Sequence, residues 1–451
     1  MKRSGWRSLR YLWSAGDIRN RILITIGLLV IYRLAAHVPV PGVNRDAIAQ
    51  ILSAGGGAGS LLNLLDLLSG GTVSRFSVLA MGVYPYITAQ IILQLLVPII
   101  PALQERVEQE SPDARQKFME KWTYYLAIPM AALSAIGQIR IFNASIPGVQ
   151  VLPHFGFSGA NLLPTITTII SMAAGTMFAI WLGELISEYG IRGQGLSLII
   201  FSGIVSRLPS NIGTMWVDEE RRVLLIATFL VLMALTVFAI VIVTQGRRKI
   251  PVFYPGKRIG ARQTMPVKDT LPLLVNMAGM IPIIFAQSIL TFPAIIAQFF
   301  TASQLEWVRN FSAGMIDLFS NSRNIGYLII YFGMVVAFSF FYTDVIFKQQ
   351  NWGENLRKAG AKVPGAAPGA PTQRYLDRVL QRITLPGALF LGIVAVLPFV
   401  AGNILQANAF TTLGSGLLIV VGVVRDMLWN LKGELDMHRY EDADLAWLLK
   451  K

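Results

Sequence analysis

Cysteine is absent from this chain of 451 residues, which excludes disulfide scaffolds, thiolate nucleophiles and cysteine-ligated metal or iron–sulfur sites. The three histidines, His37, His154 and His438, lie far apart in the sequence, and no pair has the spacing of a metal site. No glycine-rich phosphate loop ending in Gly-Lys-Ser/Thr occurs. We therefore expect no metal, no cofactor and no nucleotide motor within the chain.

Charge is also scarce. Charged residues make up 14% of the chain, against about 25% in an average soluble domain, and 54% of its residues are hydrophobic. Because a membrane-spanning helix needs about 20 mainly apolar residues, the sequence predicts an all-α membrane protein with ten spans. These spans lie near residues 22–40, 76–98, 121–139, 162–183, 196–213, 223–244, 271–298, 325–347, 384–405 and 411–429.

The basic residues give the orientation. With ten spans both termini share one side, and that side carries most of the 39 lysines and arginines. The positive-inside bias therefore predicts cytoplasmic termini. The first span lacks a small-residue cleavage site and runs on into Pro39-Val40-Pro41, so we interpret it as a retained helix rather than a cleaved signal peptide.

Two predicted cytoplasmic loops, residues 246–270 and 348–383, are long and basic. Prolines and glycines over 363–371 exclude a continued helix and predict a turn-rich tip. One interpretation is that these charges only set topology and touch anionic lipid. The other is a docking platform for an acidic protein surface or RNA phosphate. The docking candidates are Arg247, Arg248, Lys257, Arg258, Arg357, Lys358, Lys362 and Arg374.

The chain contains a faint internal repeat. Residues 82–93 and 279–290 share Gly, Pro, Ile, Ala, Gln, Ile and Leu at the same offsets, with Pro85 matching Pro282 and Gln90 matching Gln287. The two segments enter the membrane from opposite sides, which is expected of two inverted halves, 1–215 and 216–451. The proline in each predicts a bend or a mobile element.

A short apolar segment precedes the first repeat. It is too short to span, and Gly70-Gly71 follows it. It is either an interfacial helix or a movable stopper, the plug at about 57–71, folded into the mouth of the bundle. Its apolar residues are Leu61, Leu62, Leu64, Leu65, Leu67 and Leu68.

Motifs spread over nearly the whole chain resemble the SecY family, the channel subunit of the bacterial protein translocase. The motifs, in chain order, are Val38-Pro39-Val40-Pro41-Gly42-Val43, Leu68-Ser69-Gly70-Gly71, Ser74-Arg75-Phe76-Ser77, Pro85-Tyr86-Ile87, Asn276-Met277-Ala278-Gly279, Phe341-Tyr342-Thr343, Tyr375-Leu376-Asp377-Arg378-Val379-Leu380 and Arg382-Ile383-Thr384-Leu385-Pro386-Gly387-Ala388.

The resemblance implies two pseudo-symmetric five-helix halves around an hourglass pore, with a lateral gate between helices 2 and 7. The gate residues would be Pro85, Gln90, Gln94, Asn276, Pro282 and Gln287. An aliphatic ring would close the waist, formed by Val83, Ile87, Leu196, Ile200, Ile284 and Ile419. Ordinary interhelical packing is the alternative for each of these residues, and interhelical hydrogen bonding is the alternative for the glutamines and Asn276.

The resemblance also implies a passive channel rather than an enzyme, in the bacterial plasma membrane. The implied partners are SecE and SecG, the SecA ATPase, the ribosome, anionic lipids and the translocating polypeptide, without nucleic-acid specificity. The chain departs from the family at the loop tip. Ala366-Ala367 stands where relatives usually carry Ile-Arg, which removes the arginine to which a partner contact would be assigned.

Two other classes fit the hydropathy pattern. An ion-coupled transporter also uses inverted repeats but needs an acidic residue or histidine at mid-membrane, and no predicted span centre carries one. An intramembrane enzyme needs a nucleophile with a base, or a metal pair, which the spans lack. Arg33 lies within the first predicted span, so we expect it to pair or to face water.

Overall fold

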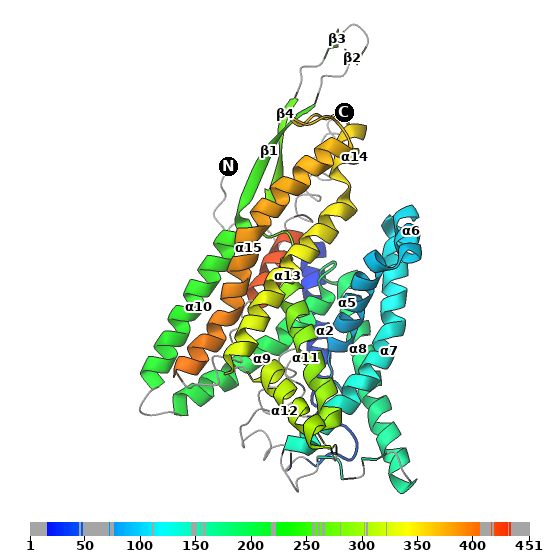
Figure 1. Cartoon of the computed structure of the whole chain (residues 1–451), viewed down its shortest axis with the longest axis vertical. Helices are drawn as coiled ribbons and strands as arrows, with labels where there is room; N and C mark the ends of the chain where they lie inside the picture. Colours follow the sequence, from blue (N-terminus) through cyan, green and yellow to red (C-terminus); the bar gives the residue numbers. More distant parts are fainter. Residues whose placement is uncertain are drawn as a thin grey trace. The chain divides into compact units, whose positions relative to one another are not determined.

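The computed structural model (Figure 1) describes residues 16–44, 47, 72, 76–110, 112–145, 151–153, 155–156, 159–217, 222–254, 258–259, 262–263, 267–279, 281–301, 303, 305–321, 323–405, 416, 419–431 and 433. The chain divides into two compact units. Unit 1 comprises residues 1–217, 288–322 and 419–451, and unit 2 comprises residues 218–287 and 323–418.

The described part of unit 1 consists of helices, the turns that connect them and one isolated β-bridge between Pro39 and Ser77. Its helices are α2 (Gly16–Ala35), α5 (Tyr84–Ile99), α6 (Pro101–Gln109), α7 (Pro112–Ser145), the 3-10 turn η2 (Gly159–Asn161), α8 (Leu162–Tyr189), α9 (Gly195–Val217), α12 (Glu306–Ser320) and residues 419–431. Helix α11 (Ile281–Phe300) belongs to both units, because the division falls after Gln287.

Unit 2 combines helices with two short antiparallel ladders. Its elements are α10 (Arg222–Gln245), β1 (Arg247–Tyr254), β2 (Arg258–Ile259), β3 (Arg262–Gln263), β4 (Val267–Leu274), α13 (Ile325–Gln350), α14 (Trp352–Lys358) and α15 (Ala370–Leu405). Helices α13 and α15 run side by side (Figure 1), and Gly392 leaves room for the Phe332 ring between them.

Several described helices are long and apolar enough to cross a membrane. They are α8, α10, α13 together with α14, and α15; α5 and α6, bent by 100° at their junction, make a fifth if counted as one broken span. Helices α9 and α11 contain shorter apolar stretches, Gly195–Ser206 and Ile281–Ala297. A multi-pass helical architecture is thus confirmed, while the number ten stays a prediction.

The helices differ from the predicted spans at several ends. The first span ends at Ala35, and residues 76–83 form turns, so the second begins only at Tyr84. Residues 271–274 belong to β4, and the helix predicted from 271 begins at Ile281. Helix α15 contains the predicted span 384–405 but begins earlier, at Ala370, and its first turns pack on the second loop through Leu376 and Leu380. Hydropathy alone reports the apolar stretch and not the helix.

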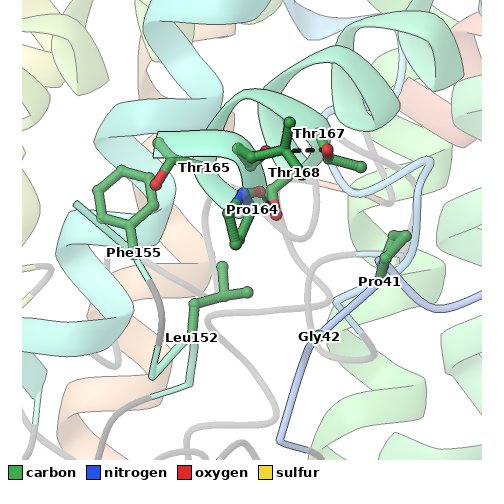
Figure 2. Close-up of a pocket in the computed structure, with 9 residues that line it drawn as sticks. Pro41, Gly42, Leu152, Phe155, Pro164, Thr165, Thr167 and Thr168 are labelled. Atoms are coloured by element: carbon green, nitrogen blue, oxygen red, sulfur yellow. Dashed lines mark hydrogen bonds between the residues drawn. The ribbon is translucent and has the colours of Figure 1, made fainter. Parts of the chain in front are cut away.

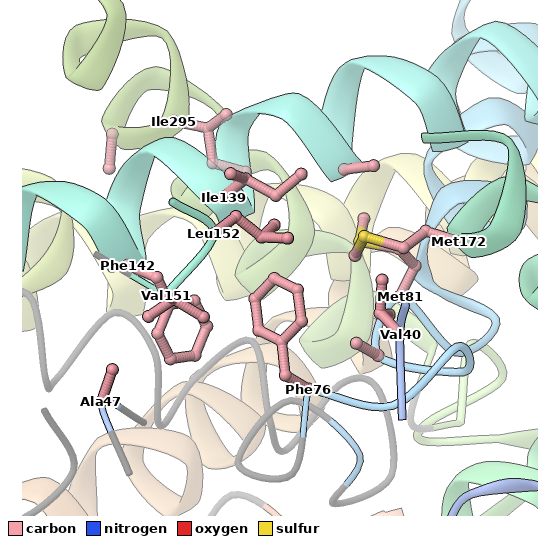
Figure 3. Close-up of a cluster of buried hydrophobic side chains, with 13 residues drawn as sticks. Val40, Ala47, Phe76, Met81, Ile139, Phe142, Val151, Leu152, Met172 and Ile295 are labelled. Atoms are coloured by element: carbon pink, nitrogen blue, oxygen red, sulfur yellow. The ribbon is translucent and has the colours of Figure 1, made fainter. Parts of the chain in front are cut away.

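The core of unit 1 gathers around Phe76 (Figure 3), whose ring meets Phe142 of α7 edge-to-face with centroids 5.0 Å apart. The backbone at Phe76 also pairs with the chain that leaves α2. Val40 donates to the Phe76 carbonyl at 3.1 Å, and Val78 donates to the Val38 carbonyl at 2.9 Å. Two motifs that are separate in the sequence thus meet in one isolated β-bridge between Pro39 and Ser77.

Candidate functional site

The two repeat segments begin their helices in the same way. Gly82 and Gly279 each adopt a positive φ, +50° and +64°, two residues before the first residue of α5 and of α11. Such a backbone conformation favours glycine, because a side chain there would strain the chain. The shared glycine therefore has a structural cause in each half.

The repeated prolines do not bend these helices, contrary to our expectation from the sequence. Pro85 and Pro282 are the second residues of α5 and α11. In a first helical turn the missing N–H costs nothing and the fixed φ favours helix initiation. The proline within a helix interior is instead Pro293 of α11.

Helices α5 and α11 are joined within unit 1 by a residue that the sequence did not single out. The Tyr84 hydroxyl donates to the Ser288 carbonyl at 3.2 Å, and both groups are buried. Ser288 is the residue after Gln287, so the contact lies beside the repeated glutamine. A tyrosine at a helix start gives no sequence signal of this role.

The predicted gate polar residues have different surroundings. Gln90 is half-buried, and Gln287 is buried. The Gln94 Oε1 atom is buried without a hydrogen-bond partner among the described residues. Asn276 donates from Nδ2 to the Gly279 carbonyl at 3.0 Å, so it stabilises the turn that precedes α11.

The ring candidates are mostly buried. Those in unit 1 are Val83, Ile87, Ile200 and Ile419, which are buried, and Leu196, which is half-buried. The Leu196 side chain packs against a buried cluster that includes Tyr86 of α5 and Ile180 of α8. Ile284 lies in the part of α11 that belongs to unit 2 and is half-buried. The assignment of all six to a pore ring stays a prediction.

The predicted plug residues Leu61, Leu62, Leu64, Leu65, Leu67 and Leu68 lie outside the described residues. Thr72, just after them, donates from its hydroxyl to the Leu79 carbonyl at 2.6 Å and is buried.

A cavity of about 180 Å³ lies beside the chain that leaves α2 (Figure 2). Pro41 and Gly42 form one wall, and Leu152, Phe155 and the first turns of α8 form the rest. The Thr165 hydroxyl donates to the Gly156 carbonyl at 2.9 Å, which ties the α8 start to the preceding loop. The Pro-Gly motif thus borders a small apolar cavity in unit 1.

The two predicted cytoplasmic loops form one structure in unit 2. The first is a hairpin of β1 and β4, with Ile250 opposite Leu271. Phe253 of β1 exchanges two backbone hydrogen bonds with Lys362 of the second loop, at 2.9 and 2.8 Å. The sequence predicted that both loops are basic and project from the membrane. It did not predict the β1–β4 hairpin or the pairing of that hairpin with the tip of the second loop.

An apolar core holds the hairpin against the second loop. It joins Ile250, Val252 and Leu273 of the hairpin to buried side chains of α13, α14, the tip and α15, namely Phe347, Leu356, Ala361, Val363, Leu376 and Leu380. We name the hairpin, α14, the tip and the first turns of α15 the platform.

The platform presents basic side chains. Exposed on it are Arg247, Arg248, Lys249, Lys268, Arg357, Lys358, Lys362, Arg374, Arg378 and Arg382. The Arg357 guanidinium donates to Glu354 at 2.6 Å and holds the pKa of that carboxyl below its usual range, so part of its charge is neutralised. Lys257 and the Arg258 side chain lie outside the described part.

These features define the class of the protein, a polytopic helical membrane protein with paired, similarly initiated helices and a folded basic platform. The SecY family model matches residues 77–428, and the chain belongs to the SecY family. It is 35% identical over 450 residues to the protein translocase subunit SecY of Haemophilus influenzae, covering 98% of this chain and 97% of that protein. The SecY of Thermotoga maritima is 37% identical over 442 residues, covering 97% of each chain.

Solved structures share the fold. A structure describing how the plug domain of the SecY protein stabilises the closed translocation channel matches with a TM-score of 0.59, at 18% identity and 92% coverage of both chains. Sec61 in a canine ribosome–channel complex matches with a TM-score of 0.56, at 17% identity and the same coverage.

Proposed function

We propose that this chain is the channel subunit of a bacterial protein translocase. It passes unfolded secretory polypeptides across the plasma membrane and releases transmembrane segments sideways between α5 and α11. The observation that carries the proposal is the similarity to translocase subunits over nearly the whole chain. The matched starts of α5 and α11 support the choice of these helices as the gate.

The proposed pore ring suits a polypeptide channel. Val83, Ile87, Leu196, Ile200, Ile284 and Ile419 are all aliphatic. A narrow aliphatic constriction excludes ions by dewetting, and it offers no charge or hydrogen bond that would hold a passing chain. A lateral opening lets an apolar segment enter lipid by the transfer energetics that define a spanning helix.

The channel itself is passive in this proposal, and partners supply the energy. The platform is the proposed docking surface for the SecA ATPase and the ribosome, because it combines a rigid apolar core with exposed arginines and lysines. Anionic lipids are a second partner of the same charges. Because the chain belongs to the SecY family, we also propose SecE and SecG as its partner subunits in the membrane.

The proposed topology has both termini in the cytoplasm and two inverted halves, 1–215 and 216–451. It rests on the positive-inside bias and on the internal repeat. The segment of about 57–71 is the proposed plug.

Site-specific crosslinking tests the channel. The chain has no cysteine, so single cysteines at Ile87 and Ile284 react against a clean background. A secretory polypeptide with one cysteine is arrested in transit. We expect adducts at both positions and none at Leu235 of α10, which is 59% exposed.

Adducts at Leu235 as well would show non-specific contact and contradict the ring. A protein that gives no adduct at Ile87 or Ile284 while conducting a small solute would support the transporter class instead.

A further inference from the structure

The helix α12 was not expected from the sequence and has no part in the proposed channel. It is amphipathic: Trp307, Phe311 and Met315 share one side, while Glu306 and Arg309 lie on the other. The Trp307 and Phe311 side chains are 70% and 63% exposed. Exposed aromatic residues opposite a charged face are typical of a helix that lies in the membrane interface.

A cavity of about 550 Å³ lies between α12 and the last turns of α11. This volume is in the range of small-molecule sites, roughly 300–1,000 Å³. Its walls are the apolar side of α12 and side chains of α11 and the connecting turn. The lining residues are Pro293, Ile296, Ala297, Phe300, Ser303, Trp307, Val308, Phe311, Ser312 and Met315.

The lining of the cavity favours an apolar ligand. Its two hydroxyl groups are used locally: Ser312 donates to the Val308 carbonyl at 2.8 Å, and Ser303 Oγ accepts from the Leu305 N–H at 3.3 Å. The remaining lining side chains are apolar, apart from the indole N–H of Trp307. A polar ligand would therefore lose its hydration and gain few side-chain partners.

The cavity is continuous with the outward apolar surface of α11. Ile296 and Phe300 line it and are at the same time 42% and 52% exposed. In a membrane protein such surface faces acyl chains, so a chain lying along α11 reaches the cavity without leaving the hydrocarbon. A membrane lipid is therefore the ligand that we expect in this cavity.

A cation flanks the lined face of α12, because Arg309 precedes the lining residue Ser312 by three positions on the helix. Arg309 lies 3.7 Å from Glu306, with exposed fractions of 53% and 84% for the two side chains. An exposed pair of this kind contributes little, so Arg309 can turn to a stronger anion. A phosphate at the interface, above an acyl chain, is such an anion.

We propose that the cavity between α11 and α12 binds one acyl chain of a membrane phospholipid, with the Arg309 guanidinium at its phosphate. The bound lipid would fill the space beside the last turns of the gate helix α11. The proposal needs only that the chain lies in a bilayer, so its failure is separate from failure of the proposed channel.

Fluorescence quenching tests the site. A single cysteine replaces Met315 and carries bimane, and the protein in detergent is titrated with phosphatidylglycerol brominated on its acyl chains. We expect quenching that saturates near one lipid per chain. The same label at Leu235 of α10, an exposed apolar position, is expected to show no saturation at such ratios.

Two variants distinguish the contribution of the acyl chain to lipid binding from the contribution of the headgroup. Ala297→Phe places a larger side chain in the cavity and is expected to abolish the saturable phase. Arg309→Glu is expected to weaken it by about fivefold or more, because one cation near an anionic headgroup contributes about 1 kcal/mol. Arg323→Glu, an exposed arginine beyond α12 that does not line the cavity, is expected to change nothing.

A linear titration at Met315, or a saturable phase unaffected by Ala297→Phe, would overturn the proposal. Absence of lipid quenching together with a crosslink from Met315→Cys to a translocating apolar segment would assign the cavity to polypeptide. A signal that depends only on protein concentration would assign it to a second copy of the chain.

Discussion

Arg33 of α2 reaches across to Ser202 of α9, where its Nε donates to the Ser202 hydroxyl at 2.9 Å and its Nη2 donates to the Ser202 carbonyl. Arg33 lies in the last turn of α2, where a cation also interacts favourably with the helix dipole. The expectation that it pairs is confirmed, although the helix ends sooner than predicted. Ser202 lies two residues beyond Ile200, so the contact holds the part of α9 that carries proposed ring residues.

Replacing Arg33 is expected to loosen that attachment. Arg33→Met should lower the free energy of unfolding by about 1.5–3 kcal/mol, the range for hydrogen bonds to a charged group. Ser202→Ala should cost less, because the carbonyl still accepts. A double-mutant cycle on detergent-solubilised protein measures the coupling, and purely additive losses would contradict a direct contact.

Tyr84→Phe removes a side-chain hydrogen bond between α5 and α11 and should destabilise unit 1 by about 0.5–1.5 kcal/mol. If these helices form the gate, the same change should raise the release of marginally apolar segments into lipid, measured by protease protection. Tyr331→Phe is the matched control. Its buried hydroxyl has no partner among the described residues, so its loss should be neutral or stabilising, and an equal effect of both variants would contradict the Tyr84 contact.

Gly195 lies against the α8 backbone: a Cβ atom there would stand 1.7 Å from the Gly183 carbonyl oxygen. Gly195→Ala should therefore displace α9 and lower thermal stability sharply. Gly213→Ala on the same helix meets nothing within 4 Å, so it should be neutral or stabilise by up to about 1 kcal/mol. Thermal unfolding of the two variants decides the point, and similar midpoints would contradict the close packing.

The two helix starts should respond alike to substitution. Gly82→Ala and Gly279→Ala each place a Cβ on a positive-φ residue, at a cost of about 1–2 kcal/mol. Chemical denaturation of each variant measures the loss. A neutral result at either glycine would contradict the shared start of α5 and α11.

Substitutions in the platform can distinguish the role of its surface charge from the role of its apolar core. Val363→Asp buries a carboxylate in the apolar core and should cost at least about 2 kcal/mol while weakening partner binding. Lys362→Glu leaves the backbone bonds to Phe253 intact, because they use no side-chain atom. It should weaken binding of the SecA ATPase or the ribosome, measured by sedimentation, without lowering the melting temperature. A stability loss for Lys362→Glu would contradict this separation.

Much of the helical architecture was predictable from hydropathy, because apolar runs such as 223–244 appear as helices with nearly the same bounds. The boundaries failed where the chain enters the membrane through turns, as at residues 76–83, since those residues are as apolar as a span. The platform was not predictable, because its backbone pairs residues more than 100 positions apart, such as Phe253 with Lys362.

The candidate site was predictable only as a set of positions. The repeat located the starts of α5 and α11. Of the two expectations for Pro85 and Pro282, a bend or a mobile element, the bend was wrong, because both prolines lie in a first helical turn. Tyr84 and α12 were missed. The tyrosine contact depends on tertiary packing, and α12 is too short and too polar on one side for a hydropathy window.

The bonds between Phe253 and Lys362 use main-chain atoms alone, so the pairing of the tip with the hairpin does not depend on the Lys362 side chain. Ala366 and Ala367 follow within a few residues, in a turn whose Gly365 has a positive φ. Ala367 is exposed, and neither alanine belongs to the apolar core of the platform. A change of residue at Ala367 therefore alters the surface that the tip presents while the hairpin and its core keep the same contacts.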